Sequence, residues 1–467
     1  MNRRGKAESG KRKAKTRESS RLRLPATAGR PHPRARSQCS RWSLPGWAAL
    51  VFVVLAALWV VACGSAAARE DARTSAGASS GERISPAAGP LDGDRFSLAP
   101  ISFWQGPKGA TSWWWQVEFR QAERIGAILQ VVGDHDFVFR NAPRRYVWQW
   151  SEDGLRWRDW TETAVANENR LYRVHRLRRD RTVRAVRLQI EAATGDAPTL
   201  REVEFFKDRD AVVPFPDWLV TVNTTHEPAL PGHGQEFIPL ARSCAGWERA
   251  PAQQIWVNDF DLAFVNVEPR PRCAFLSGNF KDWCEVDRRW WQGTERILKR
   301  RELPMWASCG GAQALALLAT YGTGQPWDCP HCRDPLHPKT PLYTHLGHTV
   351  AGPCGDYSGC LFERGPHWIQ TVTADPVFRG LPGEIQLMES HCGQIQWVPK
   401  GWQLVATAGQ GTQTKIQCLR LQGAPIYAAQ FHVEMAGTPQ TSQRIMANFL
   451  ELARQHPQTG PAGRAPR

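Results

Sequence analysis

The chain has 467 residues, of which 42% are hydrophobic and 22% charged, a composition that excludes global disorder and fits two or three folded domains. Its formal net charge is +15, but fourteen lysines and arginines against two acids lie between Met1 and Trp47. The rest of the chain is nearly neutral, so the charge does not indicate a nucleic-acid-binding body. The 22 tryptophans against 6 tyrosines favour β-sandwich cores and sugar-binding surfaces over a helical bundle.

The N-terminal part predicts export and attachment to a membrane. A basic leader at residues 1–46 precedes an apolar segment at 47–63, and this order predicts a signal or anchor that places the body outside the cytoplasm. The sequence VVACGS around Cys63 resembles a bacterial lipoprotein cleavage box, which implies lipidation of Cys63. An uncleaved anchor and a different start codon are the alternatives. Residues 64–95 are rich in alanine, serine and glycine and predict a flexible linker.

Residues 96–208 predict an antiparallel β-sandwich, because short runs of alternating apolar residues are separated by turn signals. The predicted strands lie at residues 115–119, 127–132, 146–150 and 183–190. After the third of these strands, Ser151-Glu152-Asp153-Gly154 predicts a hairpin turn in which Gly154 adopts a positive φ.

These segments resemble the discoidin family of coagulation-factor type C, galactose-binding-like jelly rolls. The resemblance is carried by Trp115–Phe119, Ser151–Trp157, Val186–Leu188 and Leu200–Phe206. It implies a domain that binds carbohydrate or another surface ligand through loops at one end of the sandwich. Trp104, Trp113 and the loop Asp134–Asp136 are candidates to stack on a sugar or to hold a metal, although a core position is the simpler interpretation for any single tryptophan.

Residues 215–454 predict a doubly wound, flavodoxin-like α/β domain, in which ligands bind at the carboxyl ends of the parallel strands. Apolar runs suited to buried strands alternate with helix-length stretches, and these runs lie at residues 218–223, 262–267 and 273–277. The predicted fold class is therefore multidomain, with a β-sandwich jelly roll followed by an α/β domain. Residues 455–467 predict a disordered tail.

A nucleophile elbow is predicted at Cys309, where an apolar strand ends, two glycines follow and a helix-forming run begins. The helix dipole favours the thiolate of a cysteine at this position, and backbone N–H groups of the same turn can bind an oxyanion. Farther along the chain, His432 and Glu434 lie two positions apart. On an extended segment they share one side, so Glu434 can orient His432 while His432 activates Cys309.

These residues resemble the class I glutamine amidotransferase family, and four motifs carry the resemblance. They are Ala307–Gln313 (G-x-C-x-G-x-Q, with Ala307 for the first glycine), Gln430–Glu434 (Q-F-H-P-E, with Val433 for proline), Phe275–Asn279 (L-S-G-G-P) and Glu389–Trp402 (the guanylate-synthetase pattern M-S-H-G-D…P-x-G-F).

The resemblance implies a role for each residue of the site. Cys309 is the nucleophile that forms a γ-glutamyl thioester, His432 is the general base and then the general acid, and Glu434 orients His432. The residues expected at the substrate are the oxyanion donors Gly278 and Gly310, and Gln313, which would help to seat the glutamine.

A cysteine- and histidine-rich insert is predicted at residues 327–368, where family members contact substrate, so the insert is a candidate lid. Its cysteines, Cys329, Cys332, Cys354 and Cys360, could bind a structural zinc ion or form two disulfides. The expected location outside the cytoplasm favours the disulfides. The predicted chemistry requires no other cofactor.

Together these features predict a membrane-tethered enzyme that hydrolyses a glutamine or γ-glutamyl amide and docks to a carbohydrate or surface ligand through its discoidin-like domain. Hydrolysis is favoured over transfer because no synthetase sequence follows the domain. Two alternatives are an amidotransferase subunit that delivers ammonia to a separate synthetase, and a catalytically silent adhesion or sensing protein. The intact set of Cys309, His432 and Glu434 argues against the silent protein. No nucleic-acid partner is expected.

Overall fold

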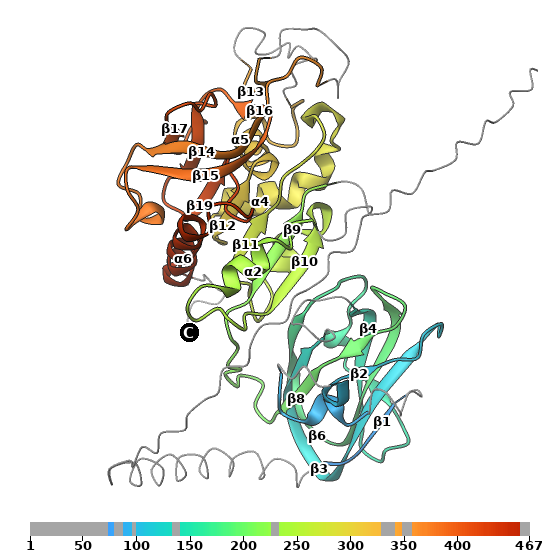
Figure 1. The fold of residues 1–467 in the computed structure, drawn as a ribbon. Helices are drawn as coiled ribbons and strands as arrows, with labels where there is room; N and C mark the ends of the chain where they lie inside the picture. The colour runs from blue at the N-terminus through green and yellow to red at the C-terminus, as the bar shows by residue number, and fades with distance from the viewer. Residues whose placement is uncertain are drawn as a thin grey trace, which may run out of the picture. The chain divides into compact units, whose positions relative to one another are not determined.

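The computed structural model describes residues 73–78, 87–95, 100–132, 141–225, 233–327, 341–347 and 357–457 (Figure 1). The basic leader, the apolar segment with Cys63 and most of the predicted tail lie outside this part of the chain. Within the described ranges, no helix combines the length and hydrophobicity needed to cross a membrane. The described residues form a β-sandwich followed by an α/β domain.

The N-terminal domain is an antiparallel β-sandwich. Its elements are β1 (Arg73–Ala78), η1 (Gly89–Leu91), η2 (Pro100–Ser102), β2 (Trp104–Gln105), β3 (Trp113–Val131), β4 (Pro143–Ser151), β5 (Arg158–Asp159), η3 (Thr161–Thr163), β6 (Tyr172–Ala193), β7 (Thr199–Leu200) and β8 (Glu202–Phe206). The main sheet has the order β1-β3-β6-β4-β5, with β8 also paired to β3, while β2 pairs with β7. A register shift between Glu118 and Glu123 interrupts the regular pairing of the long strand β3 with β6. The predicted turn after β4 is confirmed, because Gly154 has a φ of 78°.

The core of this domain contains several large tryptophan side chains among smaller aliphatic ones. Trp115 and Trp148 are fully buried and meet edge to face, with ring centroids 6.3 Å apart. Each indole N–H has a partner, because Trp148 donates to Gln130 Oε1 and Trp115 donates to the carbonyl of Ala87. These large rings are therefore buried without leaving a donor unpaired.

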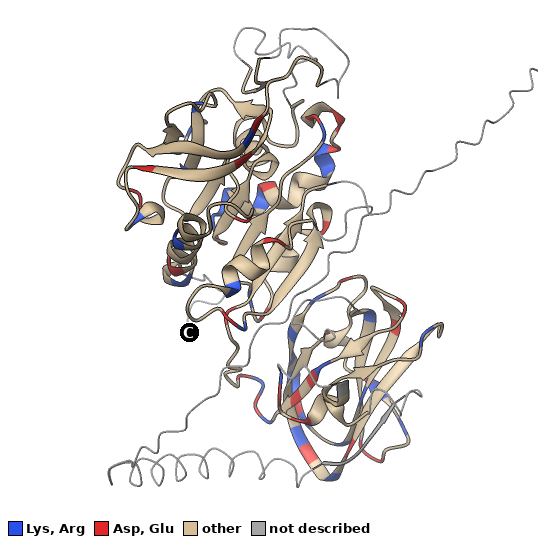
Figure 2. Cartoon of the chain, viewed as in Figure 1, with Lys and Arg blue, Asp and Glu red and all other residues tan. Residues whose placement is uncertain are grey.

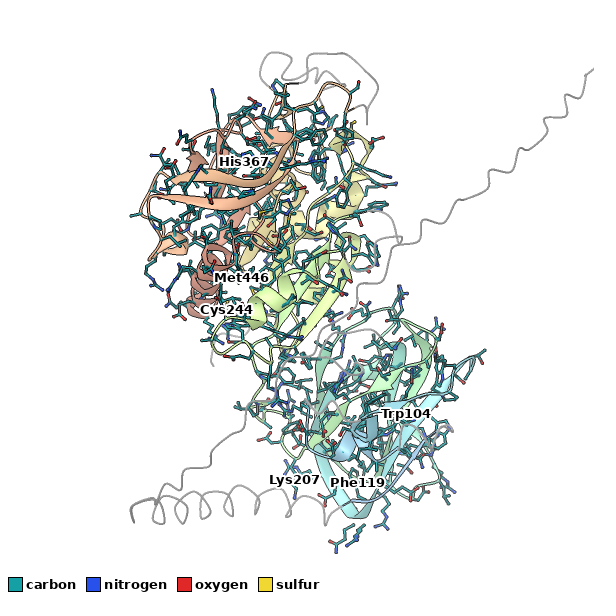
Figure 3. The ribbon with its side chains drawn as sticks, in the orientation of Figure 1. Trp104, Phe119, Lys207, Cys244, His367 and Met446 are labelled. Carbon is teal, nitrogen blue, oxygen red and sulfur yellow. The ribbon has the colours of Figure 1, made fainter. Side chains whose placement is uncertain are left out.

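Two tryptophans that were candidates for sugar stacking are core residues. Trp104 is 1% exposed and Trp113 is 5% exposed, and Figure 3 shows Trp104 within the sandwich. Trp113 also donates its indole N–H to the carbonyl of Pro107. Burial leaves neither ring with an open face for a ligand, so the core interpretation holds for both. The candidate loop Asp134–Asp136 lies outside the described residues.

Part of the predicted flexible linker is a strand. β1 pairs antiparallel with β3, with Ala76 opposite Val117. An edge strand is held by backbone hydrogen bonds on one side, so it does not need the alternating apolar pattern that identified the other strands. The sequence of β1, RTSAGA, has no such pattern, which is why the linker prediction was wrong over these residues.

The C-terminal domain is an α/β domain. Its strands are β9 (Leu219–Asn223), β10 (Ala252–Trp256), β11 (Cys273–Leu276), β12 (Met305–Ser308), β13 (Tyr343–His345), β14 (Glu363–Thr371), β15 (Glu384–His391), β16 (Gly393–Ile395), β17 (Trp402–Ala408), β18 (Ile416–Leu421) and β19 (Ile426–Ala429). Its helices are α2 (Phe237–Arg242), η4 (Val257–Asp259), α3 (Leu262–Val265), η5 (Trp283–Glu285), η6 (Arg288–Trp291), α4 (Gln292–Arg300), α5 (Gly310–Tyr321), η7 (Pro376–Phe378) and α6 (Pro439–Gln455).

The domain is organised around a nine-stranded sheet in the order β10-β9-β11-β12-β19-β18-β17-β14-β15. The first five strands are parallel and the remaining pairs are antiparallel. The parallel strands carry no charged residue, as expected for strands covered on both faces (Figure 2). A short second sheet pairs β13 with β16.

Helices cover both faces of the parallel strands, as the doubly wound prediction requires. On one face, Ile297 of α4 and Leu315 of α5 join a core with the strand residues Ala274 and Ala307. On the other face, α2 and α6 pack together over Phe275 and other strand residues. Figure 3 marks Cys244 and Met446 in this second layer. The parallel strands are therefore buried between two helical layers.

Two elements of this domain differ from the prediction. The apolar run at 262–267 is not a strand: its first four residues, Leu262–Val265, form the helix α3. Asp261 caps this helix by accepting a hydrogen bond from the backbone N–H of Phe264 at 2.8 Å. The strand β10 was not predicted, because its sequence AQQIW carries two glutamines and lacks a continuous apolar run. The predicted strands at 218–223 and 273–277 are confirmed as β9 and β11.

Candidate active site

Cys309 lies in a tight turn between strand β12 and helix α5. Its φ of 50° and ψ of −115° are unusual for a residue other than glycine, and the turn places the buried side chain at the carboxyl end of the parallel sheet. The two glycines that follow are required by close packing. A β-carbon at Gly310 would lie 2.3 Å from the backbone nitrogen of Asn279, and one at Gly311 would lie 2.7 Å from the carbonyl oxygen of Ser277. The predicted strand–turn–helix geometry is confirmed.

His432 and Glu434 form a hydrogen-bonded pair just beyond the neighbouring strand β19. His432 Nδ1 lies 2.7 Å from Glu434 Oε1, and the other carboxylate oxygen accepts a hydrogen bond from the Ser308 hydroxyl at 2.9 Å. The backbone N–H of His432 donates to the carbonyl of Met388 at 2.8 Å. The side chains of both residues are buried, so their mutual orientation is fixed from several directions.

The surroundings of His432 favour its charged form. Burial opposes the imidazolium, but the carboxylate of Glu434 and the thiol of Cys309 outweigh burial and raise the pKa of His432 well above its usual value. Because Nδ1 is occupied by Glu434, Nε2 is the nitrogen left for Cys309. The imidazole thus lies between the carboxylate and the thiol, the order in which a histidine can take the proton of a cysteine.

Gly278 lies between the nucleophile and the base. A β-carbon built on Gly278 would be 3.8 Å from Cys309 Cβ and 3.9 Å from His432 Cε1. The carbonyl oxygen of Ser390 lies 3.9 Å from Cys309 Sγ. The structure therefore brings together the predicted residues Cys309, His432 and Gly278 with the elbow at Gly310.

Comparison with known proteins identifies both domains. The family model of the F5/8 type C domain matches residues 71–203. GMP synthase (glutamine-hydrolyzing) of Thermus thermophilus is 40% identical over 78 residues, which cover 17% of this chain and 15% of the relative. A GMP synthase (glutamine-hydrolyzing) subunit of Thermococcus kodakarensis is 32% identical over 84 residues, which cover 18% of this chain and 43% of the relative. The chain carries a discoidin domain followed by a class I glutamine amidotransferase-like domain.

Similarity is also found among solved structures. Chitosan-binding module 1 of a chitosanase/glucanase from Paenibacillus sp. IK-5 is 18% identical, covers 29% of this chain and 96% of its own length, and has a TM-score of 0.25. The alignments with the two synthase relatives span less than half the length of either protein. Those relatives are therefore similar to one part of this chain only.

Gln313 lies one turn into α5 of the amidotransferase-like domain and is buried. Its amide nitrogen donates to the Gly393 carbonyl at 3.0 Å and to Gln430 Oε1 at 3.2 Å, and its oxygen accepts from the Trp283 indole at 3.1 Å. The side chain thus ties three segments together beneath the site. Its contact with a bound glutamine stays a prediction.

His233, which no sequence motif indicated, joins the site of the amidotransferase-like domain from the loop after β9. Its Nε2 lies 3.1 Å from the Gly278 carbonyl oxygen, and its ring packs against Phe280 with centroids 5.1 Å apart. A carbonyl only accepts, so His233 donates this hydrogen bond and holds the peptide beside Cys309. A single histidine in a loop carries no pattern from which this role could be predicted.

A buried histidine between two carboxylates was also missed. His391 Nε2 lies 2.8 Å from Glu389 Oε2 and 3.4 Å from Glu363 Oε2, and all three side chains are buried. His391 directly follows Ser390, whose carbonyl faces Cys309. Glu389 and His391 lie two positions apart on β15, and alternate strand residues point to one face. This spacing was the feature of the sequence from which their contact could have been predicted.

The predicted insert is described in part. Residues 341–347 contain β13, and from Glu363 onward the range belongs to β14 of the main sheet. Cys329, Cys332 and Cys354 lie outside the described residues, so zinc binding, disulfides and a lid stay predictions. Over the ranges that the structure describes, no group of three or more histidine, cysteine or acidic side chains is arranged to hold a metal ion. The fourth cysteine, Cys360, lies 3.4 Å from His345 Nδ1.

Proposed function

We propose that the amidotransferase-like domain hydrolyses the side-chain amide of glutamine or of another γ-glutamyl compound through a thioester on Cys309. The observation that carries the proposal is the thiol at the elbow beside the buried pair of His432 and Glu434. The names of the two synthase relatives, which describe them as glutamine-hydrolyzing, support glutamine as the amide donor.

The reaction follows from the positions of these groups. The thiolate of Cys309 attacks the amide carbon, and the backbone N–H groups of Gly278 and Gly310 are the proposed donors to the resulting oxyanion. His432 gives its proton to the leaving nitrogen, and the carbon–nitrogen bond breaks to release ammonia. Water then attacks the thioester, His432 takes its proton, and the carbon–sulfur bond breaks to release the γ-carboxylate and restore the thiol. Glu434 stabilises the imidazolium whenever it forms.

Ammonia delivery to a separate synthetase is a second candidate function. The observation in its favour is that the Thermococcus relative is named as one subunit of a synthase, which implies that this synthase has a further, separate chain. Release of ammonia at a steady rate by this chain alone supports hydrolysis as the complete function. A rate that stays very low until a partner is added supports delivery.

We further propose that the discoidin domain docks the enzyme to carbohydrate or another surface ligand, and that the segment at 47–63 attaches it to a membrane through lipidated Cys63. The family to which the discoidin domain belongs and the cleavage-box sequence support these two roles. Membrane fractionation of the full chain and of Cys63→Ser tests the attachment. Equal recovery of both proteins in the soluble fraction contradicts it.

Intact-protein mass spectrometry with the glutamine analogue 6-diazo-5-oxonorleucine tests the active site. The full chain should gain one adduct, and Cys309→Ala should gain none. Cys244→Ala is a matched control, because Cys244 is another buried thiol but packs in the layer of α2 and α6. This control should label like the wild type. A folded wild-type protein that gains no adduct and releases no ammonia from glutamine contradicts the proposal and favours the silent protein.

A further inference from the structure

A second arrangement of cysteine, histidine and carboxylate lies in the same domain. The Cys360 sulfur is 3.4 Å from His345 Nδ1, and His345 Nε2 is 2.7 Å from Asp282 Oδ1. The three residues come from separate segments, because Asp282 precedes η5, His345 ends β13 and Cys360 precedes β14. The side chains of His345 and Asp282 are completely buried, whereas Cys360 is partly exposed. The partly exposed Cys360 thiol thus lies next to the buried pair of His345 and Asp282.

The hydrogen bonds determine which nitrogen of His345 faces the sulfur. An ionised carboxylate can only accept, so Nε2 carries a proton for Asp282 and Nδ1 is directed at Cys360. Two aromatic rings hold the imidazole in this orientation: Tyr357 at 5.0 Å and Tyr343, edge to face, at 5.6 Å between centroids. This is the geometry in which an imidazole accepts the proton of a thiol and the carboxylate stabilises the imidazolium.

Cys392 supplies a second thiol beside this group. It directly precedes β16, where Gly393 pairs with His345 across the small sheet. The backbone N–H of Leu346 donates to the Cys392 carbonyl at 2.7 Å, and that of Leu361 donates to the Leu346 carbonyl at 2.9 Å. These bonds bring the segments of Cys360 and Cys392 to the same strand end.

The two thiols have different surroundings. Cys392 is a buried thiol, whereas Cys360 is partly exposed. Burial, reinforced by the neighbouring Cys360, raises the pKa of Cys392 to about 12. Cys360 has access to solvent and an imidazole beside it that can accept its proton, whereas Cys392 is buried. This difference separates an attacking thiol from a resolving thiol.

We propose that Cys360 is a peroxide-reactive thiol whose oxidised form makes a disulfide with Cys392. In the first step the Cys360 sulfur attacks one peroxide oxygen, the O–O bond breaks, and the second oxygen leaves as water with the proton held by His345. In the second step Cys392 attacks the sulfenic sulfur, the S–O bond breaks, and the hydroxide leaves as water with the Cys392 proton. The thiol pair loses two electrons and the peroxide gains them. The disulfide bond brings the two sulfurs to about 2.0 Å.

The proposal does not depend on amide hydrolysis, so it is tested in the full-length Cys309→Ala chain, which removes the thiol of the proposed active site. The reduced protein is treated with hydrogen peroxide, and its peptides are mapped without reduction. A peptide pair joined through Cys360 and Cys392 is expected. A bridge from Cys360 to Cys329, Cys332 or Cys354 overturns the proposal. Oxidation of Cys360 that begins only after a zinc chelator is added also overturns it, because the thiol is then a metal ligand.

Variants separate the two steps. Cys392→Ser should trap the sulfenic acid, detected as a dimedone adduct on Cys360, whereas the control Cys244→Ser should bridge like its parent. His345→Gln and Asp282→Asn should each slow the oxidation of Cys360 at least tenfold. Cys392→Ser leaves His345 and Asp282 unchanged. Its dimedone adduct therefore still tests the proposal if His345→Gln and Asp282→Asn unfold. Absence of the adduct, or an unchanged rate in a folded His345→Gln, overturns the proposal.

Discussion

Replacing Gly310 with alanine tests the packing that positions the elbow. A β-carbon at residue 310 would lie 2.3 Å from the backbone nitrogen of Asn279 and 2.7 Å from its Cβ. Ordinary contacts between heavy atoms need about 3.5–4.0 Å, so the start of α5 and the turn at Asn279 must separate by about 1 Å. The atoms that this β-carbon would meet are backbone atoms and the Cβ of Asn279, and rotation of a side chain moves none of them. We expect a loss of about 1–3 kcal/mol in the free energy of unfolding.

The same displacement should slow the chemistry. A shift of about 1 Å in a positioned group can reduce a rate about 100-fold. Because Gly310 is the proposed oxyanion donor next to Cys309, Gly310→Ala should react with 6-diazo-5-oxonorleucine about 100-fold more slowly than the wild type. The assay combines the rate of labelling, measured by intact mass, with the urea midpoint of unfolding.

Two other glycines provide matched controls. A β-carbon at Gly324 would meet no atom within 4 Å, so Gly324→Ala should leave both the urea midpoint and the labelling rate unchanged. A β-carbon at Gly278 makes only ordinary contacts, the nearest at 3.8 Å, so Gly278→Ala should fold like the wild type. It should nevertheless label more slowly, because its methyl group enters the space between Cys309 and His432. A Gly310→Ala protein with wild-type stability and labelling rate would refute this reasoning.

Three further changes test the hydrogen bonds around the site. In the wild type, the stability that the His432 imidazolium contributes is complete below about pH 6.5 and is lost as the pH rises through the raised pKa of His432. The labelling rate should fall over the same alkaline range. Glu434→Gln removes the carboxylate that raises this pKa, so it should move both the loss of stability and the fall in labelling rate to lower pH. An unchanged pH profile of labelling would contradict the role of Glu434. Ser308→Ala removes the 2.9 Å hydrogen bond to Glu434, so its urea midpoint should report a loss of about 0.5–1.5 kcal/mol, with a smaller loss of labelling rate than in Glu434→Gln. Gln313→Leu leaves the buried Trp283 indole N–H without its acceptor and should cost about 1–3 kcal/mol in urea unfolding, and a variant as stable as the wild type would contradict the bridging role of Gln313.

The features that the sequence predicted correctly depend on short stretches of chain. The elbow at Cys309 needs only an apolar strand, a tight turn with small residues and a helix-forming run, and all of these lie within one continuous segment. The turn at Gly154 likewise follows from four residues. His432 and Glu434 lie two positions apart, so their hydrogen bond is also a local matter. In each case the residues that determine the geometry are neighbours in the chain.

Predictions from a single apolar run were less secure. The run at 262–267 fits a strand and a buried helix equally well, and the Asp261 cap decides for the helix. β10 is a strand because it pairs with β9, although its own residues show no apolar pattern. The same holds for β1 at the edge of the sandwich. Strand pairing is a property of two segments, so one segment alone cannot reveal it.

The sequence by itself therefore determined the order of the two domains, the nucleophile elbow at Cys309 and the pairing of His432 with Glu434. Only the tertiary structure decided that Trp104 and Trp113 are core residues, that His233 holds the Gly278 carbonyl, and that Asp282, His345 and Cys360 meet in one cluster. The physical reason is that burial and side-chain contact between distant segments depend on how the strands and loops pack. The segments of that cluster are separated by 63 and 15 residues, and the hydrogen bonds between them exist only after the sheet has formed.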